Sequence, residues 1–147
     1  MPEKKKKLKT GVIRQKVLIP NSSPEAVYRA MLSSMEHSAF TGSEAKVSAR
    51  VGAKFTAWDG YITGKNLELE PGKKIVQEWR TSEWPEDYEP STLRITLTRK
   101  KNDGTELAIV QTNVPQSQVS MYDEGWHTSY WEPMKEYFAN KKKTDVV

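Results

Sequence analysis

The sequence predicts an α+β domain in which a curved antiparallel sheet of about seven strands wraps around one long C-terminal helix. Short helices are expected between the first and second strands. Three features support this fold class. Aromatic residues recur at helical spacing near the C-terminus. Short alternating segments separated by tight-turn sequences fill the middle of the chain, and a well-capped helix sequence separates them from an N-terminal strand.

The N-terminal segment predicts a strand followed by a helix. Residues 11–19 combine alternation with β-branched side chains, and Pro20 ends this strand. Ser23 is a favourable N-cap residue, and Pro24 suits the first helical position, where no backbone N–H is needed. This helix is expected to run to about residue 33, and a compact turn of helix or loop follows it.

Regular turn sequences divide the middle of the chain into short strands. Asp59-Gly60, Pro71-Gly72 and Asn102-Asp103-Gly104 are tight-turn sequences that join neighbouring strands. Strands joined in this way must be antiparallel. Their alternation of apolar and polar residues indicates that one face of the sheet is covered and the other is wet. We expect these strands at residues 45–49, 54–58, 61–70, 74–80, 91–100 and 105–112.

The long helix over residues 120–138 organises the predicted fold because its large rings need a broad apolar surface to lie on. Its apolar side is expected to contain Val119, Tyr122, Trp126, Tyr130, Met134, Tyr137 and Phe138. Gly125 costs about 1 kcal/mol relative to alanine inside a helix, so its expected use is to let another backbone or ring approach closely. Pro133 removes one helical hydrogen bond and crowds the carbonyl of Ser129, which predicts a kink.

The composition is that of a single domain. With 147 residues the chain is long enough for a hydrophobic core without disulfides, and it contains no cysteine. No apolar stretch approaches the roughly 18 residues that a membrane span requires. The basic N-terminus has no apolar segment behind it and does not resemble a secretory signal, so the cytoplasm is the expected location.

The net charge of +4 is concentrated at the two ends of the chain. Most of the lysines in these ends stand in unbroken runs, whereas the rest of the chain carries a small acidic excess. We expect a flexible basic tail over residues 1–10, one domain over residues 11–139 and a second flexible basic tail over residues 140–147. No strand interleaves exposed aromatic residues with arginine, so no nucleic-acid partner is expected.

The sequence offers little for catalysis or metal binding. His37 and His127 are the only histidines, and neither has the spacing typical of metal ligands, so both are expected to be surface or packing residues. No serine lies in a GxSxG sequence, and cysteine is absent. The sequence GYITGK at residues 60–65 is one residue short of a phosphate-binding loop. We therefore predict no enzymatic activity, no metal and no cofactor.

The space between the helix and the sheet is the remaining candidate site. Large rings with polar edges can line a pocket for an apolar ligand, and they can equally fill that space by packing on one another. Gln77 is expected to be the one polar group that fixes the orientation of a ligand. The candidate lining residues are Phe55, Gln77, Trp79 and Ile95 on the sheet and Trp126, Tyr130 and Met134 on the helix.

Several motifs, taken in their order along the chain, resemble those of one known family. They are WDGYITGKNLELEPGKKIVQEWR at residues 58–80, the WP pair at residues 84–85, the Asp103-Gly104 hairpin and GWHTSYWEPMKEYF at residues 125–138. The family is the C-terminal-domain type of the activator of the heat-shock-protein-90 ATPase, within the START-like helix-grip superfamily (SRPBCC). The resemblance covers about residues 12–138.

The resemblance implies a helix-grip fold with seven antiparallel strands, and it implies two alternative functions. Members of the superfamily hold lipids or hormones between helix and sheet, which implies a hydrophobic small molecule as ligand. In the eukaryotic co-chaperones a separate chaperone-binding domain precedes this one, which implies a heat-shock chaperone as partner and a role in the stress response. A packed interior would favour the protein partner, and a void on the order of several hundred Å³ would favour the ligand.

Overall fold

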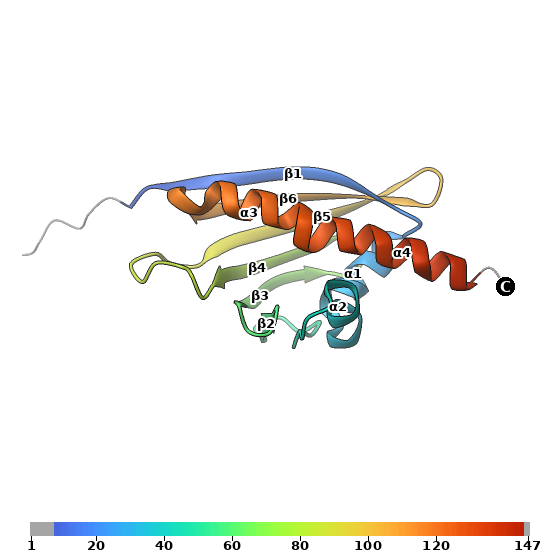
Figure 1. The fold of residues 1–147 in the computed structure, drawn as a ribbon, viewed down its shortest axis with the longest axis horizontal. Helices are drawn as coiled ribbons and strands as arrows, with labels where there is room; N and C mark the ends of the chain where they lie inside the picture. Colours follow the sequence, from blue (N-terminus) through green and yellow to red (C-terminus); the bar gives the residue numbers. More distant parts are fainter. Residues whose placement is uncertain (1–7, 146–147) are drawn as a thin grey trace, which may run out of the picture.

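A computed structural model of the chain describes residues 8–145 and arranges them as one antiparallel sheet with helices on one of its faces (Figure 1). The elements are β1 (Thr10–Pro20), α1 (Pro24–Leu32), α2 (Ser34–Thr41), β2 (Lys54–Ala57), β3 (Ile62–Glu70), β4 (Lys74–Thr81), β5 (Ser91–Lys100), β6 (Gly104–Pro115), η1 (Gln116–Gln118), α3 (Val119–Trp126), η2 (His127–Trp131) and α4 (Glu132–Asp145).

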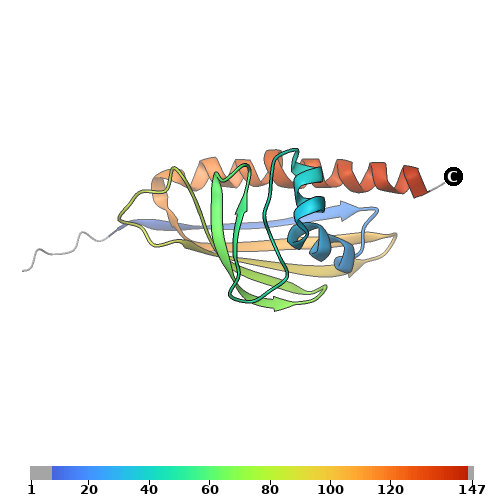
Figure 2. The same ribbon diagram turned by 90° about the horizontal axis from the view of Figure 1, so that it is seen from below.

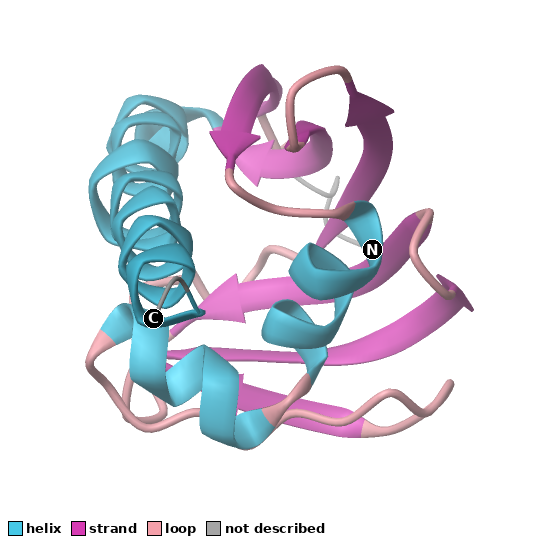
Figure 3. Ribbon diagram, turned by 90° about the vertical axis from the view of Figure 1, so that its right-hand side faces the viewer, coloured by secondary structure: helices cyan, strands magenta, loops and turns pink. Residues whose placement is uncertain are grey.

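The sheet has the strand order β1-β6-β5-β4-β3-β2, and every neighbouring pair is antiparallel. Four of these five pairs follow from hairpins between consecutive strands, and only β1 pairs with a strand that is distant in sequence. The sheet curves around the continuous helical segment α3–η2–α4 (Figure 3). Figure 2 shows α2 beside that segment and α1 next to α2, on the same side of the sheet. The α+β class and the long C-terminal helix are therefore confirmed.

The sheet has six strands, so the prediction of about seven is wrong. The expected strand at residues 45–49 forms one isolated bridge, between Lys46 and Thr56. The neighbouring backbone N–H and C=O groups form hydrogen bonds with side chains instead. The Ser34 hydroxyl accepts from the N–H of Val47 at 2.9 Å and donates to its carbonyl at 3.0 Å. Asn66 donates to the carbonyls of Ser48 and of Arg50, which follows the segment. Backbone groups held in this way do not extend a ladder.

The two short helices begin where local hydrogen bonding favours them. The Ser23 hydroxyl accepts from the Ala26 N–H at 3.1 Å, which confirms the predicted N-cap of α1. Ser33 plays the same part for α2, and that helix ends at Gly42, whose φ of +78° is readily available to glycine. The caps place α2 against the C-terminal helix, where His37 of α2 lies 2.9 Å from the hydroxyl of Tyr130.

The C-terminal helix accommodates Pro133 through a π-helical turn rather than a break in the helix. Pro133 has no N–H to offer the preceding turn, and in η2 the N–H of Glu132 bonds the carbonyl of His127, five residues back. A π turn inserts one extra residue, which turns the following side chains by about 100° relative to a regular α-helix. The inward face consequently includes Trp131 and Phe138, whereas Tyr137 is only half-buried.

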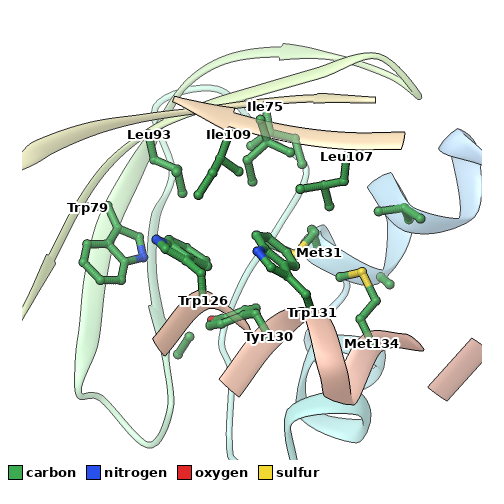
Figure 4. Close-up of a cluster of buried hydrophobic side chains, with 14 of the residues drawn as sticks. Met31, Ile75, Trp79, Leu93, Leu107, Ile109, Trp126, Tyr130, Trp131 and Met134 are labelled. Atoms are coloured by element: carbon green, nitrogen blue, oxygen red, sulfur yellow. The ribbon is translucent and has the colours of Figure 1, made fainter. Parts of the chain in front are cut away.

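The core lies between this face and strands β4, β5 and β6 (Figure 4). The indole of Trp126 stacks on that of Trp131 with ring centroids 5.3 Å apart and planes 11° from parallel. The sheet supplies the opposing aliphatic side chains Ile75, Leu93, Leu107 and Ile109, each no more than 1% exposed. Trp126 is thus buried at the centre of the contact between helix and sheet, as predicted.

The ends of the ordered elements extend past the predicted domain limits. β1 begins at Thr10, and α4 continues to Asp145, so residues 140–145 of the predicted tail are helical. The remaining tail residues 1–7 and 146–147 lie outside the described part of the chain. The division into one domain and two flexible tails stays a prediction. Within residues 8–145, no helix combines the length and apolar character needed to cross a bilayer.

Candidate functional site

A pocket of about 250 Å³ opens along one flank of the C-terminal helix, between that helix and the turn joining β2 to β3. Its lining is largely aromatic, and the helix contributes six of its ten residues. It contains Trp58, Tyr61, Ile62 and Trp79 from the sheet side, and Met121, Tyr122, Gly125, Trp126, Ser129 and Tyr130 from the helix.

Gly125 keeps this pocket open. We predicted that its missing side chain would let another backbone or ring approach closely, and this is wrong. A Cβ placed on Gly125 would find no heavy atom within 4 Å outside its own neighbourhood in the helix. The glycine therefore leaves a gap in the helical wall where a larger side chain would project into the pocket.

Trp58 forms the opposite wall and has two unusual properties. Its backbone has φ +52°, in the left-handed region that bulky residues rarely adopt, at the start of a turn with Asp59 and Gly60. Its indole Nε1 is buried and has no hydrogen-bond partner among the described residues. Unusual backbone conformations and unpaired buried donors both tend to concentrate at functional sites.

The polar groups at the rim of the pocket are neutral phenols. Tyr61 donates a short hydrogen bond to a carboxylate oxygen of Glu83, and the hydroxyls of Tyr122 and Thr81 lie 2.6 Å apart. Burial, together with the hydrogen bond to Glu83, raises the pKa of Tyr61 well above its ordinary value. Burial also raises the pKa of Tyr122. Both phenols therefore keep their protons at neutral pH.

The space predicted between helix and sheet is nearly filled. Five of the predicted residues, Phe55, Gln77, Trp79, Trp126 and Tyr130, line an internal void of about 10 Å³. That volume is close to the minimum for one water molecule. Trp79, Trp126 and Tyr130 also line the larger pocket. Ile95 and Met134 are fully buried and line neither space. A role for any of the seven in ligand binding stays a prediction.

Gln77 faces the interior, but its amide is used within the protein. It donates to the Asn66 side-chain oxygen at 2.9 Å, and the Asn66 amide nitrogen holds the backbone that precedes β2. The buried amides of Asn66 and Gln111 were both missed in the sequence. Gln111 accepts from the Trp126 indole N–H at 2.8 Å. Its position in phase with Leu107 and Ile109 was the available signal for an inward side chain.

His37 is a buried packing residue that ties α2 to the helix. Its Nδ1 lies 3.0 Å from the Met31 carbonyl and its Nε2 lies 2.9 Å from the Tyr130 hydroxyl. The carbonyl can only accept, so Nδ1 carries the proton and the Tyr130 hydroxyl donates to Nε2. Burial lowers the pKa of the His37 imidazole below 6.5, and burial raises the pKa of Tyr130.

The side chains that line the pocket are mainly aromatic, with the hydroxyls of Tyr61, Tyr122, Ser129 and Tyr130 as their polar groups. Its lining includes no carboxylate and no imidazole. Across residues 8–145, no three histidine, cysteine or acidic residues cluster in a way that would hold a metal ion. Flat apolar groups suit such aromatic walls because ring edges and faces offer offset-stacked and edge-to-face contacts.

A curved antiparallel sheet closed by one long C-terminal helix, with an aromatic pocket beside that helix, defines a START-like, helix-grip domain. Within this class the particular family is shown by sequence. A family model described as Activator of Hsp90 ATPase homolog 1-like protein matches residues 21–139. The chain belongs to this family.

Curated relatives and a solved structure agree with this assignment. The human Activator of 90 kDa heat shock protein ATPase homolog 1 is 34% identical over 118 residues, covering 80% of this chain and 34% of the relative. A homologue from Dictyostelium discoideum is 32% identical, covering 97% of this chain and 36% of the relative. An HSP90 activator from Plasmodium falciparum has the same fold, with TM-score 0.71, 23% identity and coverage of 89% and 96%. The chain thus spans about a third of the length of these curated relatives.

Proposed function

We propose that this protein is a non-catalytic binding domain that takes a small hydrophobic molecule in the aromatic pocket beside its C-terminal helix. The observation that carries the proposal is the open space at Gly125, which faces a pocket walled by Trp58, Trp79 and Trp126. Most of these walls come from residues that also build the core, so the pocket is held in shape by the fold. The cytoplasm is the proposed location.

The size of the pocket limits the ligand. Pockets for drug-sized ligands usually measure about 300–1,000 Å³, whereas a cavity of roughly 150 Å³ accepts benzene. A pocket of about 250 Å³ fits a single ring, a pair of fused rings or a short alkyl chain. The internal void of about 10 Å³ accepts no organic ligand. The proposed site therefore lies to the side of the space identified from the sequence and shares three of its residues.

A titration with 2-naphthol tests this proposal. Tryptophan fluorescence and the amide signals of Trp58 and Gly125 should change together on binding. Gly125→Leu fills the gap in the helical wall and should weaken binding at least tenfold, on the order of the loss expected when a side chain replaces the ligand. Thr128→Leu, on an exposed part of the same helix, is the matched control and should bind normally.

Two results would contradict the proposal. One is equal affinity of the Gly125→Leu and Thr128→Leu variants for 2-naphthol. The other is a set of amide shifts confined to the outer face of the sheet or to the loop around Trp84. Recovery of unmodified 2-naphthol after long incubation with the protein would support binding without chemistry.

A second candidate function comes from the relatives. Their names describe activation of the ATPase of a 90 kDa heat-shock protein, and this chain matches about a third of their length. The nearly filled interior favours a protein partner over a ligand held deep between helix and sheet. Under this alternative, adding the chain to a purified 90 kDa heat-shock chaperone raises its ATPase rate, and Gly125→Leu leaves that increase intact. An unchanged ATPase rate would exclude direct activation by this chain alone.

A further inference from the structure

The two edges of the sheet differ in how they are protected. The β2 edge has a short strand of four residues, and the bridge between Lys46 and Thr56 lies against it. The β1 edge is eleven residues long, and its register with β6 is unbroken from Ile13 to Pro20. Figure 1 shows β1 along the outer edge of the molecule, with no other element beyond it. Long unprotected edges are templates for a further strand.

The backbone of this edge is available for pairing. In a strand, the N–H and C=O of alternate residues point to opposite sides, so about half of those in β1 point away from β6. Within residues 8–145, the only side-chain hydrogen bond to the backbone between Ile13 and Ile19 is that of the Ser22 hydroxyl to the Ile19 carbonyl. Among the described residues, no backbone group outside the ladder bonds this stretch. The outward groups of this stretch are therefore available to a strand from another molecule.

The side chains of this edge carry positive charge on the outer face of the sheet. Arg14 and Lys16 are exposed on β1, and Arg94 lies on the same row as Arg14, two strands away. None of the three forms an ion pair with another described residue. The apolar side chains of Val12 and Leu18, 44% and 51% exposed, stand at the two ends of the charged pair.

We infer that the β1 edge binds an extended acidic segment of another protein as an added antiparallel strand. Carboxylates at alternate positions of that segment would face Arg14 and Lys16, and its main chain would bond the free groups of Ile13–Ile19. A second copy of this chain fits poorly. Antiparallel pairing of two β1 strands centred on Gln15 sets Arg14 of one copy opposite Lys16 of the other, and like charges in that position repel.

The experiment uses the full chain and a synthetic peptide, Glu-Val-Glu-Val-Glu-Val-Glu, with blocked ends. Binding should shift the amide signals of β1 and slow hydrogen exchange of its outward N–H groups. The double variant Arg14→Glu/Lys16→Glu should weaken binding by roughly tenfold or more, because each exposed ion pair gives way to a repulsion. The same peptide with lysine in place of glutamate should not bind the native protein and should bind the double variant.

Two N-methylated peptides distinguish strand addition from simple charge attraction. One carries the methyl groups on its valine nitrogens and the other on its glutamate nitrogens. Because alternate N–H groups point to one side, only one of these peptides should lose its affinity. Equal binding of both, or equal binding of the lysine peptide, would overturn the inference. Reversible dimerisation through β1 without peptide would also overturn it, in favour of a second copy.

Discussion

The two flanks of the C-terminal helix are closed in different ways. On the flank that faces β1, Gln15 donates to the Asp123 carbonyl at 2.7 Å and accepts from the Trp131 indole N–H at 2.7 Å. On the flank that faces the β2–β3 turn, Gly125 and Ser129 border an open pocket. Polar groups tie the helix to the sheet on one side, and aromatic walls stand apart on the other. The difference shows that one helix can be anchored along one edge and still leave binding space along the other.

The largest effect is expected where the two flanks meet, at Trp126. Its ring stacks on Trp131 toward β1 and lies 5.4 Å from Trp79 at the pocket. Trp126→Ala should lower the free energy of unfolding by about 3–5 kcal/mol, through lost packing and an unpaired oxygen on Gln111. Urea unfolding measures this loss. Met121→Ala, at a residue that is 44% exposed, is the control and should change little. An unchanged urea midpoint in Trp126→Ala would contradict the placement of this helix in the core.

Gln15→Leu should break the closed flank. The buried indole N–H of Trp131 loses its acceptor, and an unsatisfied buried donor costs about 1–3 kcal/mol. The free energy of unfolding should fall by that amount, and hydrogen exchange along β1 should become faster. Arg14→Ala, next to it on the exposed face, should stay within about 0.5 kcal/mol of the native protein. Equal losses in both variants would mean that the Gln15 hydrogen bonds do not anchor the helix.

Acidification should weaken the open flank, where Tyr130 both borders the pocket and donates to His37. The folded protein keeps the imidazole neutral because burial lowers the pKa of His37, whereas the unfolded chain takes up a proton near pH 6.5. The unfolded chain therefore binds more protons than the folded protein below about pH 6.5. The free energy of unfolding is unaffected by protonation of His37 above that pH and declines below it, by at most about 1.4 kcal/mol per pH unit. Unfolding at about pH 7.5 and pH 5.5 gives the slope. The His37→Asn variant should show a shallower slope, and an identical slope would show that His37 is not the titrating group.

The smallest expected effect is a gain. Gly125→Ala should raise the free energy of unfolding by up to about 1 kcal/mol, because alanine is the better helix former and its methyl group meets open space. Gly11→Ala is the matched variant on the closed flank. Its Cβ would come within 2.9 Å of Val119, so a loss of about 1 kcal/mol is expected. Thermal unfolding of both variants makes the comparison. A loss for Gly125→Ala would mean that the pocket is closed in solution.

Local rules predicted the elements of this fold well. Turn sequences such as Asp103-Gly104 and the Ser23 cap act through neighbouring backbone groups, so the sequence alone reveals them. The missing strand at residues 45–49 depended on Ser34 and Asn66, which come from other elements. The burial of Trp131 depended on a π turn. Interactions between elements that are distant in sequence cannot be recognised from the spacing of apolar residues within one element.

The candidate site was harder to predict than the fold for a related reason. The helical positions of Trp126 and Tyr130 follow from spacing, and these residues do lie at the pocket. Whether rings that face one another meet or stand apart depends on gaps much smaller than a side chain. Gly125 shows the difficulty, since the absence of a side chain indicates equally a close neighbour or an empty space. The atoms that surround Gly125 in the folded structure decide between a close neighbour and an empty space, and the sequence does not reveal them.

The pairing of β1 with β6 has a consequence for the order in which the chain matures during synthesis. The first strand leaves the ribosome long before residues 104–115, its only strand partner, and before the helix that Gln15 anchors. Contacts of such long sequence separation form late and slow folding. A nascent chain therefore carries β1 and the uncovered hairpins until β6 and the C-terminal helix have been made. Pairing of β1 with β6 and docking of the helix on Gln15 therefore follow the synthesis of β6 and α3, and the apolar side chains of the earlier strands stay without these partners until then.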